Sequence, residues 1–443
     1  MLTGDHAGTA SAIAREVGIL PQNMGALAPE LANALVKTAN EFDAMSDDEI
    51  DALPELPLVI ARCAPNTKTR MIAALHRRKK YAAMTGDGVN DAPSLKAADV
   101  GIAMGLSGSD IAKGQAELVL TDDNFASIVA AVEEGRRLYL NIQKFILHLL
   151  VSNVAEVVLL IVGLAFQDTS GFSVFPLSPL QILWINMLTS SFPAFGLGRE
   201  KAAADIMKRP PHDNRKGVFT PQILVDMLVY GLLMGSCTLL TFVIVVFGTG
   251  GGELGTNCNI GYSASCDVVF RARAAVFAEL TWLILISAWE FKSLRHSMFN
   301  LDPLSRDPQR PTRFPFFYDV YHNRFLFYAV VIGAVSVFPA VYIPGLNQKV
   351  FKHSGITWEW GLSVGSIFIF VAGVELWKLI KRRFALFDLG GAEEEARKGS
   401  RLTRAEKGLT LRQGFVSFAK SFTSMSEKVN DSRGQSLMGR TTT

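Results

Sequence analysis

Six long apolar segments constrain this 443-residue chain more than any other feature of its sequence. The hydrocarbon core of a bilayer is about 30 Å thick, and a helix needs about 20 residues to cross it. Each segment supplies that length or nearly does, so the sequence predicts six transmembrane helices rather than six buried helices of a large soluble protein. The segments are Phe145–Phe166, Leu177–Gly198, Ile223–Gly248, Ala274–Phe291, Phe325–Ile343 and Trp360–Ile380.

Basic residues in the connecting loops predict the orientation, because Lys and Arg are retained on the cytoplasmic side. The loop Gln167–Pro176 has none, whereas the loops after the second and fourth segments are basic. Lys349 and Lys352 in the last loop are a weak exception. We therefore expect a multi-pass protein, most simply of the plasma membrane, with both chain ends in the cytoplasm. The basic residues are Arg199, Lys201, Lys208, Arg209, Arg215 and Lys216 after the second segment, and Lys292, Arg295, Arg306, Arg310, Arg313 and Arg324 after the fourth.

Net charge and cysteine positions indicate which partners the chain binds and which of its loops is exposed to oxidising conditions. A net charge of +3 is too small to indicate a nucleic-acid partner. The predicted partner of this chain is the lipid bilayer. Cys258 and Cys266 share the predicted extracytoplasmic loop Thr249–Phe270. Oxidising conditions on that side favour a disulfide between them over two free thiols.

The chain divides by composition into three regions. Residues 1–138 alternate short apolar strands with helices, which predicts an α/β domain. Residues 139–390 form a stalk and the six membrane helices, with a nearly uninterrupted helical pattern from Asp123 to Phe166. Residues 391–443 are rich in basic and small polar residues, which predicts a disordered cytoplasmic tail.

Two similar loops in the α/β region have the features of a magnesium and phosphate site. Thr3–Asp5 and Thr85–Asp87 both read TGD after a short apolar strand. Ligands of doubly wound sheets bind beyond the carboxyl ends of the strands, so both loops are expected to face one site. Magnesium prefers oxygen ligands and is often held by one or two carboxylates beside a phosphate, which suits Asp87 and Asp91. A third strand is followed by Pro65 at a helix start and by Lys68, which is either a solvated surface lysine or a partner of phosphate.

The string TGDGVNDAPSLKAADVGIAMG, Thr85–Gly105, together with MLTGDHAGTASAIAREVGI at the start of the chain, resembles the phosphorylation domain of P-type cation-transporting ATPases. The resemblance implies part of a haloacid-dehalogenase-like Rossmannoid domain, with magnesium as cofactor and ATP as substrate. It also implies roles for seven residues. Asp87 binds magnesium, Lys68 neutralises phosphate charge, Asn90 hydrogen-bonds the phosphate, Asp91 orients Lys68, and Thr3, Gly4 and Asp5 help to hold the phosphate.

Polar residues inside two apolar segments mark a predicted cation pathway, because they are costly in a membrane. Asn153 and Glu156 lie three residues apart on one helix face, and Asn186, Thr189 and Ser190 precede Pro193 in the next segment. A helix break at that proline would free backbone carbonyls as further ligands. The alternative is hydrogen bonding between helices without an ion.

The family resemblance limits the choice of transported cation. Calcium pumps and sodium,potassium pumps have ion-coordinating residues at the positions of Asn153, Glu156, Asn186 and Thr189, but an aspartate where this chain has Ser190. A hydroxyl lowers the negative charge of the site, so the pattern looks like the fungal sodium-efflux branch (type IID), with calcium transport as the alternative. Glu279 is a further candidate cation ligand. It is a weaker candidate than the residues above and a better one than Glu290. No ion role is predicted for Glu375 or Asp226.

The resemblance covers about residues 1–390, yet the sequence has no DKTGT motif to supply the phosphorylated aspartate. The family's actuator domain, its nucleotide-binding domain and its first four membrane helices have no counterpart either. We therefore expect the carboxyl-terminal portion of a pump, inactive by itself and needing an amino-terminal portion. The alternatives are an inactive membrane partner or regulator of an intact pump, or a passive ion pathway.

Overall fold

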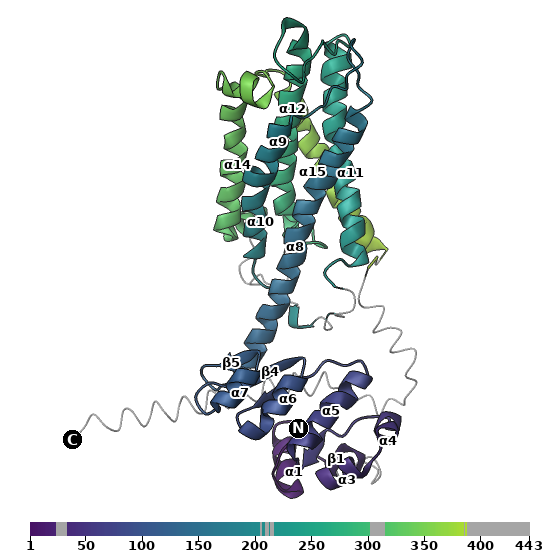
Figure 1. Ribbon diagram of the computed structural model, residues 1–443, viewed down its shortest axis with the longest axis vertical. Coiled ribbons are helices and arrows are strands. Elements are labelled where there is room, and N and C mark those ends of the chain that lie inside the picture. Colours follow the sequence, from purple (N-terminus) through teal and green to yellow (C-terminus); the bar gives the residue numbers. More distant parts are fainter. Residues whose placement is uncertain are drawn as a thin grey trace, which may run out of the picture. The chain divides into compact units, whose positions relative to one another are not determined.

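The computed structural model describes residues 1–23, 33–203, 206–208, 212, 217–301, 315–384 and 386–387. These residues form two compact units that divide after Val132, which we call the amino-terminal unit and the membrane unit (Figure 1). The predicted tail, residues 391–443, lies outside the described residues, as do the loop residues Arg209, Arg215, Lys216, Arg306, Arg310 and Arg313.

Short helices and strands alternate along the amino-terminal unit, as expected of an α/β domain. Local sequence fixes several helix starts. Thr38 with Glu41, and Ser46 with Glu49, form capping boxes in which each side chain satisfies a free backbone N–H of the first helical turn. The elements are α1 (Ala7–Glu16), β1 (Val36–Thr38), α3 (Ala39–Ala44), α4 (Asp47–Ala52), β2 (Val59–Ala61), α5 (Pro65–Arg77), β3 (Ala83–Gly86), α6 (Ala92–Ala97), β4 (Val100–Met104), α7 (Asp110–Gln115) and β5 (Leu118–Leu120).

All described strand pairs are parallel, but they form two sheets rather than one. In the first sheet β2 pairs with β1, and Leu2 forms a parallel bridge to Ile60. Val59 and Ala61 pack with α1 on one face, and Ile60 packs with α3, α4 and α5 on the other. The second sheet has the order β3-β4-β5. Helices on both faces bury β2 completely, which explains its short, wholly apolar sequence.

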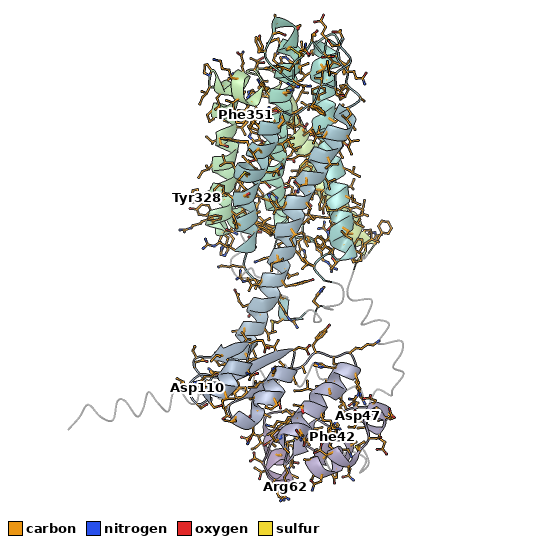
Figure 2. The ribbon with its side chains drawn as sticks, in the orientation of Figure 1. Phe42, Asp47, Arg62, Asp110, Tyr328 and Phe351 are labelled. Carbon is orange, nitrogen blue, oxygen red and sulfur yellow. A yellow bond between two sulfur atoms is a disulfide. The ribbon has the colours of Figure 1, made fainter. Side chains whose placement is uncertain are left out.

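Arg70 of α5 shows how the helices around the first sheet are held together. Its guanidinium donates to the Asp47 carboxylate at 3.0 Å and lies over the ring of Phe42, two residues labelled in Figure 2. It also donates to the backbone carbonyls of Phe42 and Asp43 at 3.2 and 2.9 Å. One side chain therefore joins α5 to both preceding helices.

Long helices make up the membrane unit and pack side by side (Figure 1). Among the described residues, four helices are long and apolar enough to cross a membrane: Phe125–Gly163, Pro221–Thr249, Arg324–Tyr342 and Trp360–Arg383. The elements are α8 (Phe125–Gly163), α9 (Pro179–Trp184), the π-helix η3 (Ile185–Ser190), α10 (Ser191–Gly198), α11 (Pro221–Val243), the π-helix η6 (Ile244–Thr249), α12 (Asp267–Glu290), α13 (Pro315–His322), α14 (Arg324–Tyr342) and α15 (Trp360–Arg383).

The two other predicted membrane segments are also helical. Pro179–Gly198 runs through α9, η3 and α10, and the helix widens before Pro193 instead of breaking there. α12 is buried along nearly its whole length and packs against α11, α14 and α15, even though it contains Arg273, Glu279 and Glu290. A central helix can hold such residues only if neighbouring helices satisfy them.

Glycines let the helices approach closely. A Cβ atom added at Gly231 of α11 would lie 2.5 Å from Cγ1 of Val154 on α8, and one added at Gly373 of α15 would lie 2.5 Å from a methyl group of Leu233. Both distances are far below van der Waals contact. Close backbone approach at small residues is the usual way in which membrane helices gain packing energy.

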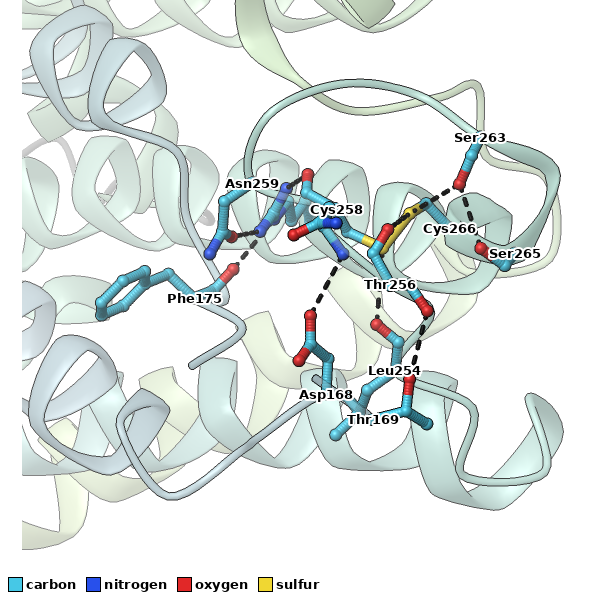
Figure 3. Close-up of a disulfide and its surroundings, with 12 residues drawn as sticks. Asp168, Thr169, Phe175, Leu254, Thr256, Cys258, Asn259, Ser263, Ser265 and Cys266 are labelled. Atoms are coloured by element: carbon cyan, nitrogen blue, oxygen red, sulfur yellow. Dashed lines mark hydrogen bonds between the residues drawn. A yellow bond between two sulfur atoms is a disulfide. The ribbon is translucent and has the colours of Figure 1, made fainter. Parts of the chain in front are cut away.

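The predicted disulfide between Cys258 and Cys266 is confirmed (Figure 3). Beside it, the buried Arg273 donates to the carbonyl oxygens of Phe175 and Cys258, each at 2.9 Å, and to the side chain of Asn259. Asp168 accepts the N–H of Asn257 at 3.1 Å. The disulfide-bonded loop is thus held both to α12 and to the loop that follows α8.

Candidate phosphate and cation sites

Lys68 and Asp91 form an ion pair in the amino-terminal unit, with 2.5 Å between Nζ and Oδ1. The lysine lies in the first turns of α5, after β2, and the aspartate follows β3. Both side chains are largely buried, at 15% and 14% exposure. The contact brings together two of the residues predicted to act on phosphate. Pro65 begins α5, as the sequence predicts.

The first TGD loop is ordered by its own side chains. Thr3 Oγ1 donates to Asp5 at 2.9 Å and accepts the Asp5 N–H at 3.1 Å. The Thr3 carbonyl accepts the N–H of Cys63, just before α5, at 2.9 Å. This loop therefore lies beside the segment that leads to Lys68, although the described contacts do not join Asp5 to Lys68 or Asp91.

Asp87 and Asn90 are exposed in the second TGD loop. The Asp87 carbonyl accepts the N–H of Ser109 at 2.8 Å, which fixes its backbone and leaves its carboxylate facing solvent. Magnesium keeps several waters and takes one or two protein carboxylates in phosphate sites. An exposed Asp87 suits that need. Among the described residues, no three or more His, Cys, Asp or Glu side chains lie together as a metal site.

Gly86→Ala is expected to disrupt this loop, because the new Cβ would lie 2.6 Å from Cβ and 2.9 Å from Oδ2 of Asp91. Overpacking of this kind costs about 1–3 kcal/mol. Hydrogen exchange of peptides covering residues 83–97 should accelerate. Gly88→Ala is the matched control, since its Cβ would be 3.8 Å from the nearest atom. Equal exchange in both variants would contradict the prediction.

Asp123 is a structural residue that the sequence reasoning missed. Its carboxylate accepts the N–H groups of Gly105, Leu106 and Ser107 at 2.5, 3.0 and 2.7 Å, and the Ser107 hydroxyl at 2.8 Å. It thereby joins the loop after β4 to the residues that precede α8. The sequence did contain a signal for this role, because two adjacent aspartates, Asp122 and Asp123, lie just before the start of a helix.

The hydrogen bonds from Leu106, Ser107 and Gly105 favour the charged carboxylate and lower the pKa of Asp123 to about 2. A lowered folded-state pKa stabilises the fold above the unfolded-state value of about 3.9, and that contribution is lost as pH falls toward 2. We expect protection of the 105–107 amides, corrected for intrinsic exchange, to fall between pH 4 and pH 2. Asp123→Asn should lose protection at pH 7 and lack this pH dependence. An identical pH profile in both proteins would contradict the assignment.

In the membrane unit, the structure brings Glu156 of α8 and Asn186 of η3 together. The Asn186 amide donates to both carboxylate oxygens, at 3.1 and 2.8 Å, and Glu156 is only 5% exposed. This bifurcated contact, from one amide nitrogen to both carboxylate oxygens, orients the amide and leaves the side-chain carbonyl oxygen of Asn186 available. A buried carboxylate and a neighbouring amide oxygen are suitable ligands for a cation.

The two other predicted ligands on this segment are buried hydroxyls. Thr189 Oγ1 donates to the Ile185 carbonyl at 2.9 Å, and Ser190 Oγ has no hydrogen-bond partner among the described residues. Both lie in η3, where the wider π-helical turn directly precedes Pro193. Such π-helical turns often occur at functional sites. Asn153, by contrast, is exposed, and the described contacts do not join its side chain to Glu156.

Glu290, the weakest of the ion candidates, has a lysine partner, as do Asp226 and Glu375, for which no ion role is predicted. Lys378 contacts Glu290 at 2.5 Å with both side chains fully buried, and Lys381 contacts the buried Asp226 at 2.7 Å. Glu375 accepts the Met298 N–H at 2.7 Å. The sequence reasoning missed both lysines, although charged residues in the last turns of an apolar segment were a signal.

Comparison with known proteins gives the family. Residues 174–380 match the model of the family described as cation transporting ATPase, C-terminus. The chain is 55% identical over 383 residues to the sodium/potassium exporting P-type ATPase cta3 of Schizosaccharomyces pombe, covering 86% of this chain and 36% of that protein. It is 53% identical to the sodium/potassium exporting P-type ATPase 2 of Saccharomyces cerevisiae, covering 87% of this chain and 35% of that protein.

A calcium-transporting relative is less similar. The calcium-transporting ATPase 1 of Bacillus cereus is 34% identical over 384 residues, covering 86% of this chain and 39% of that protein. The chain thus spans a little over a third of the length of these relatives. The chain belongs to the P-type cation-transporting ATPases and corresponds to their carboxyl-terminal portion.

Proposed function

We propose that this chain takes part in the ATP-driven export of monovalent cations, sodium or potassium, from the cytoplasm through an aspartyl-phosphate cycle. The buried contact between Glu156 and Asn186 carries the proposal, because it places a carboxylate and an amide inside a membrane helix bundle. The higher identity to sodium/potassium exporting pumps than to the calcium pump supports the choice of ion. The proposal includes six membrane spans, a haloacid-dehalogenase-like phosphorylation domain and a plasma-membrane location with both ends cytoplasmic.

Ser190 supports a monovalent ion. It supplies a buried hydroxyl oxygen without a negative charge, so Glu156 is the acidic side chain among the predicted ligands. Calcium affinity depends strongly on the number of charged ligands, and one carboxylate with hydroxyl and amide oxygens makes a weak calcium site. Asn153 and Thr189 complete the proposed set of ligands.

In the amino-terminal unit, the proposed roles follow the chemistry of phosphoryl transfer, which needs positioning and charge neutralisation. Asp87 would hold magnesium, which supplies positive charge next to the transferred phosphoryl group. Lys68, oriented by Asp91, would place a second positive charge there. Asn90 and the loop Thr3–Asp5 would hydrogen-bond the phosphate.

A chimaeric pump tests this function. We would replace the matching region of the Saccharomyces cerevisiae sodium/potassium exporting P-type ATPase 2 with this chain and express the product in cells without such exporters. We expect sodium tolerance to be restored and sodium efflux to be blocked by vanadate, a phosphate mimic. A chimaeric pump that reaches the membrane in normal amounts and exports neither sodium nor potassium would overturn the proposal.

Ser190→Asp in the chimaeric pump tests the ion choice separately. Adding a second carboxylate should raise calcium-dependent ATP hydrolysis about tenfold or more, because calcium sites gain affinity with each charged ligand. Ser170→Asp, which adds the same charge in an exposed loop, is the matched control. An unchanged ion profile in the Ser190 variant would contradict the role of that hydroxyl.

A further inference from the structure

Glu279, in the middle of α12, is a buried carboxylate with no ionic partner among the described residues. It is 0% exposed, and neither of its carboxylate oxygens makes a hydrogen bond there. The other fully buried carboxylates of the membrane unit all contact a base: Asp226 contacts Lys381, Glu290 contacts Lys378, and Glu359 contacts Arg271. Glu279 is therefore the exception that needs an explanation.

Two hydroxyl groups from neighbouring helices lie near this carboxyl group. Thr241 of α11 and Ser366 of α15 are its polar neighbours, and both are buried, at 2% and 7% exposure. Cys237, one turn before Thr241 on α11, is near enough to interact electrostatically with Glu279. The site thus lies where α11, α12 and α15 meet.

In the part of the chain that the structure describes, no basic side chain from the helices packed against α12 pairs with this carboxyl group. On α15, Lys378 faces Glu290 and Lys381 faces Asp226. On α14, Arg324 lies over the ring of Tyr321. The sequences of η3, η6 and α10 contain no acidic or basic residue, and Cys266 of the short turn before α12 is in the disulfide. Cys237 and Tyr230 of α11 are neutral groups when protonated.

An ionised carboxylate without a partner is very costly in an apolar interior, so the group must bind a positive charge. A proton meets this need with the neighbours at hand. A protonated carboxyl group gains one O–H donor, which either hydroxyl can accept, and its other oxygen can accept a hydrogen bond in return. A metal cation would need more oxygen ligands than one carboxyl group and two hydroxyls provide.

We propose that Glu279, Thr241 and Ser366 form a proton-binding site in the membrane unit, separate from the contact between Glu156 and Asn186. The site goes beyond the proposed function, which assigns nothing to these residues. Loss of the proton would leave a bare charge between three packed helices. Any state in which Glu279 ionises must therefore admit water or a cation between α11, α12 and α15.

Infrared spectroscopy of the purified full chain in lipid nanodiscs tests this site without requiring transport. At pH 7 we expect a C=O stretching band of a protonated carboxyl group that disappears in Glu279→Gln. The glutamine is uncharged and of the same shape as protonated glutamate, so the variant should fold. Glu253→Gln, the same change at an exposed position, should leave the band in place. A wild-type spectrum with no band that depends on Glu279 would overturn the proposal.

Two further measurements keep the test decisive. Thr241→Val should shift the band in frequency, because it removes a hydrogen-bond partner while Glu279 remains. Exchanging choline for sodium or potassium should leave the band unchanged. Replacement of the band by a carboxylate band when an alkali cation is added would show a metal-cation site and would also overturn the proposal. None of these results depends on whether the chimaeric pump exports sodium.

Discussion

Replacing Lys378 with methionine is expected to lower the free energy of unfolding of the membrane unit by about 3–5 kcal/mol. Lys378 Nζ lies 2.5 Å from Glu290 Oε2 and 2.8 Å from the Glu290 carbonyl, and both side chains are 0% exposed. Methionine has a similar volume but leaves the Glu290 charge buried without its partner. All six tryptophans lie in this unit, so tryptophan fluorescence during denaturant unfolding reports its stability.

The double variant Lys378→Met with Glu290→Gln separates charge from packing. Removing both charges of a buried pair is often nearly neutral, so the double variant should recover most of the loss. Lys349→Met, at an exposed lysine, is the control and should change little. A double variant as unstable as the single one would mean that the lysine acts through packing rather than through its charge.

Glu156→Gln in the chimaeric pump is expected to raise the sodium concentration for half-maximal ATP hydrolysis by about 10- to 100-fold. Glutamine keeps the shape and one oxygen that can accept the Asn186 amide hydrogen bond, but it loses the negative charge. Interactions of a charged group contribute about 1.5–3 kcal/mol, and each 1.4 kcal/mol is a factor of ten. Glu253→Gln is the matched control. Unchanged sodium activation in the Glu156 variant would remove this carboxylate from the site.

Several features could be predicted because they depend on residues close together in the sequence. Apolar segments long enough to cross a bilayer stand out by length alone. Cys258 and Cys266 are eight residues apart in one loop, so few other pairings compete. Glu156 and Asn186 stood out as polar residues inside apolar helices, although their direct contact depends on how α8 and η3 pack.

Other features depend on which distant segments meet, and the sequence does not contain that information in a local form. Lys378 and Glu290 are 88 residues apart, and their contact exists because α15 packs along α12. The π-helical turn of η3 has no separate sequence signal, and the helix continues through Pro193 after this widened turn, without the break considered for that position. Strand pairing is equally non-local, and the described strands separate into two parallel sheets.

Glu279 was only partly predictable from the sequence. A glutamate within an apolar segment is a signal for a function in the membrane, and the sequence singled it out on that ground. Its environment could not be predicted, since Thr241 and Ser366 come from two other helices. The absence of a base among the described neighbours is what changes the expectation from a metal ligand to a proton site.

ATP hydrolysis by the purified chimaeric pump, measured against sodium, potassium and calcium in turn, tests the proposed function most directly. We predict that sodium or potassium activates hydrolysis and that calcium does not. Activation by calcium alone would contradict monovalent export and would favour the calcium-pump alternative.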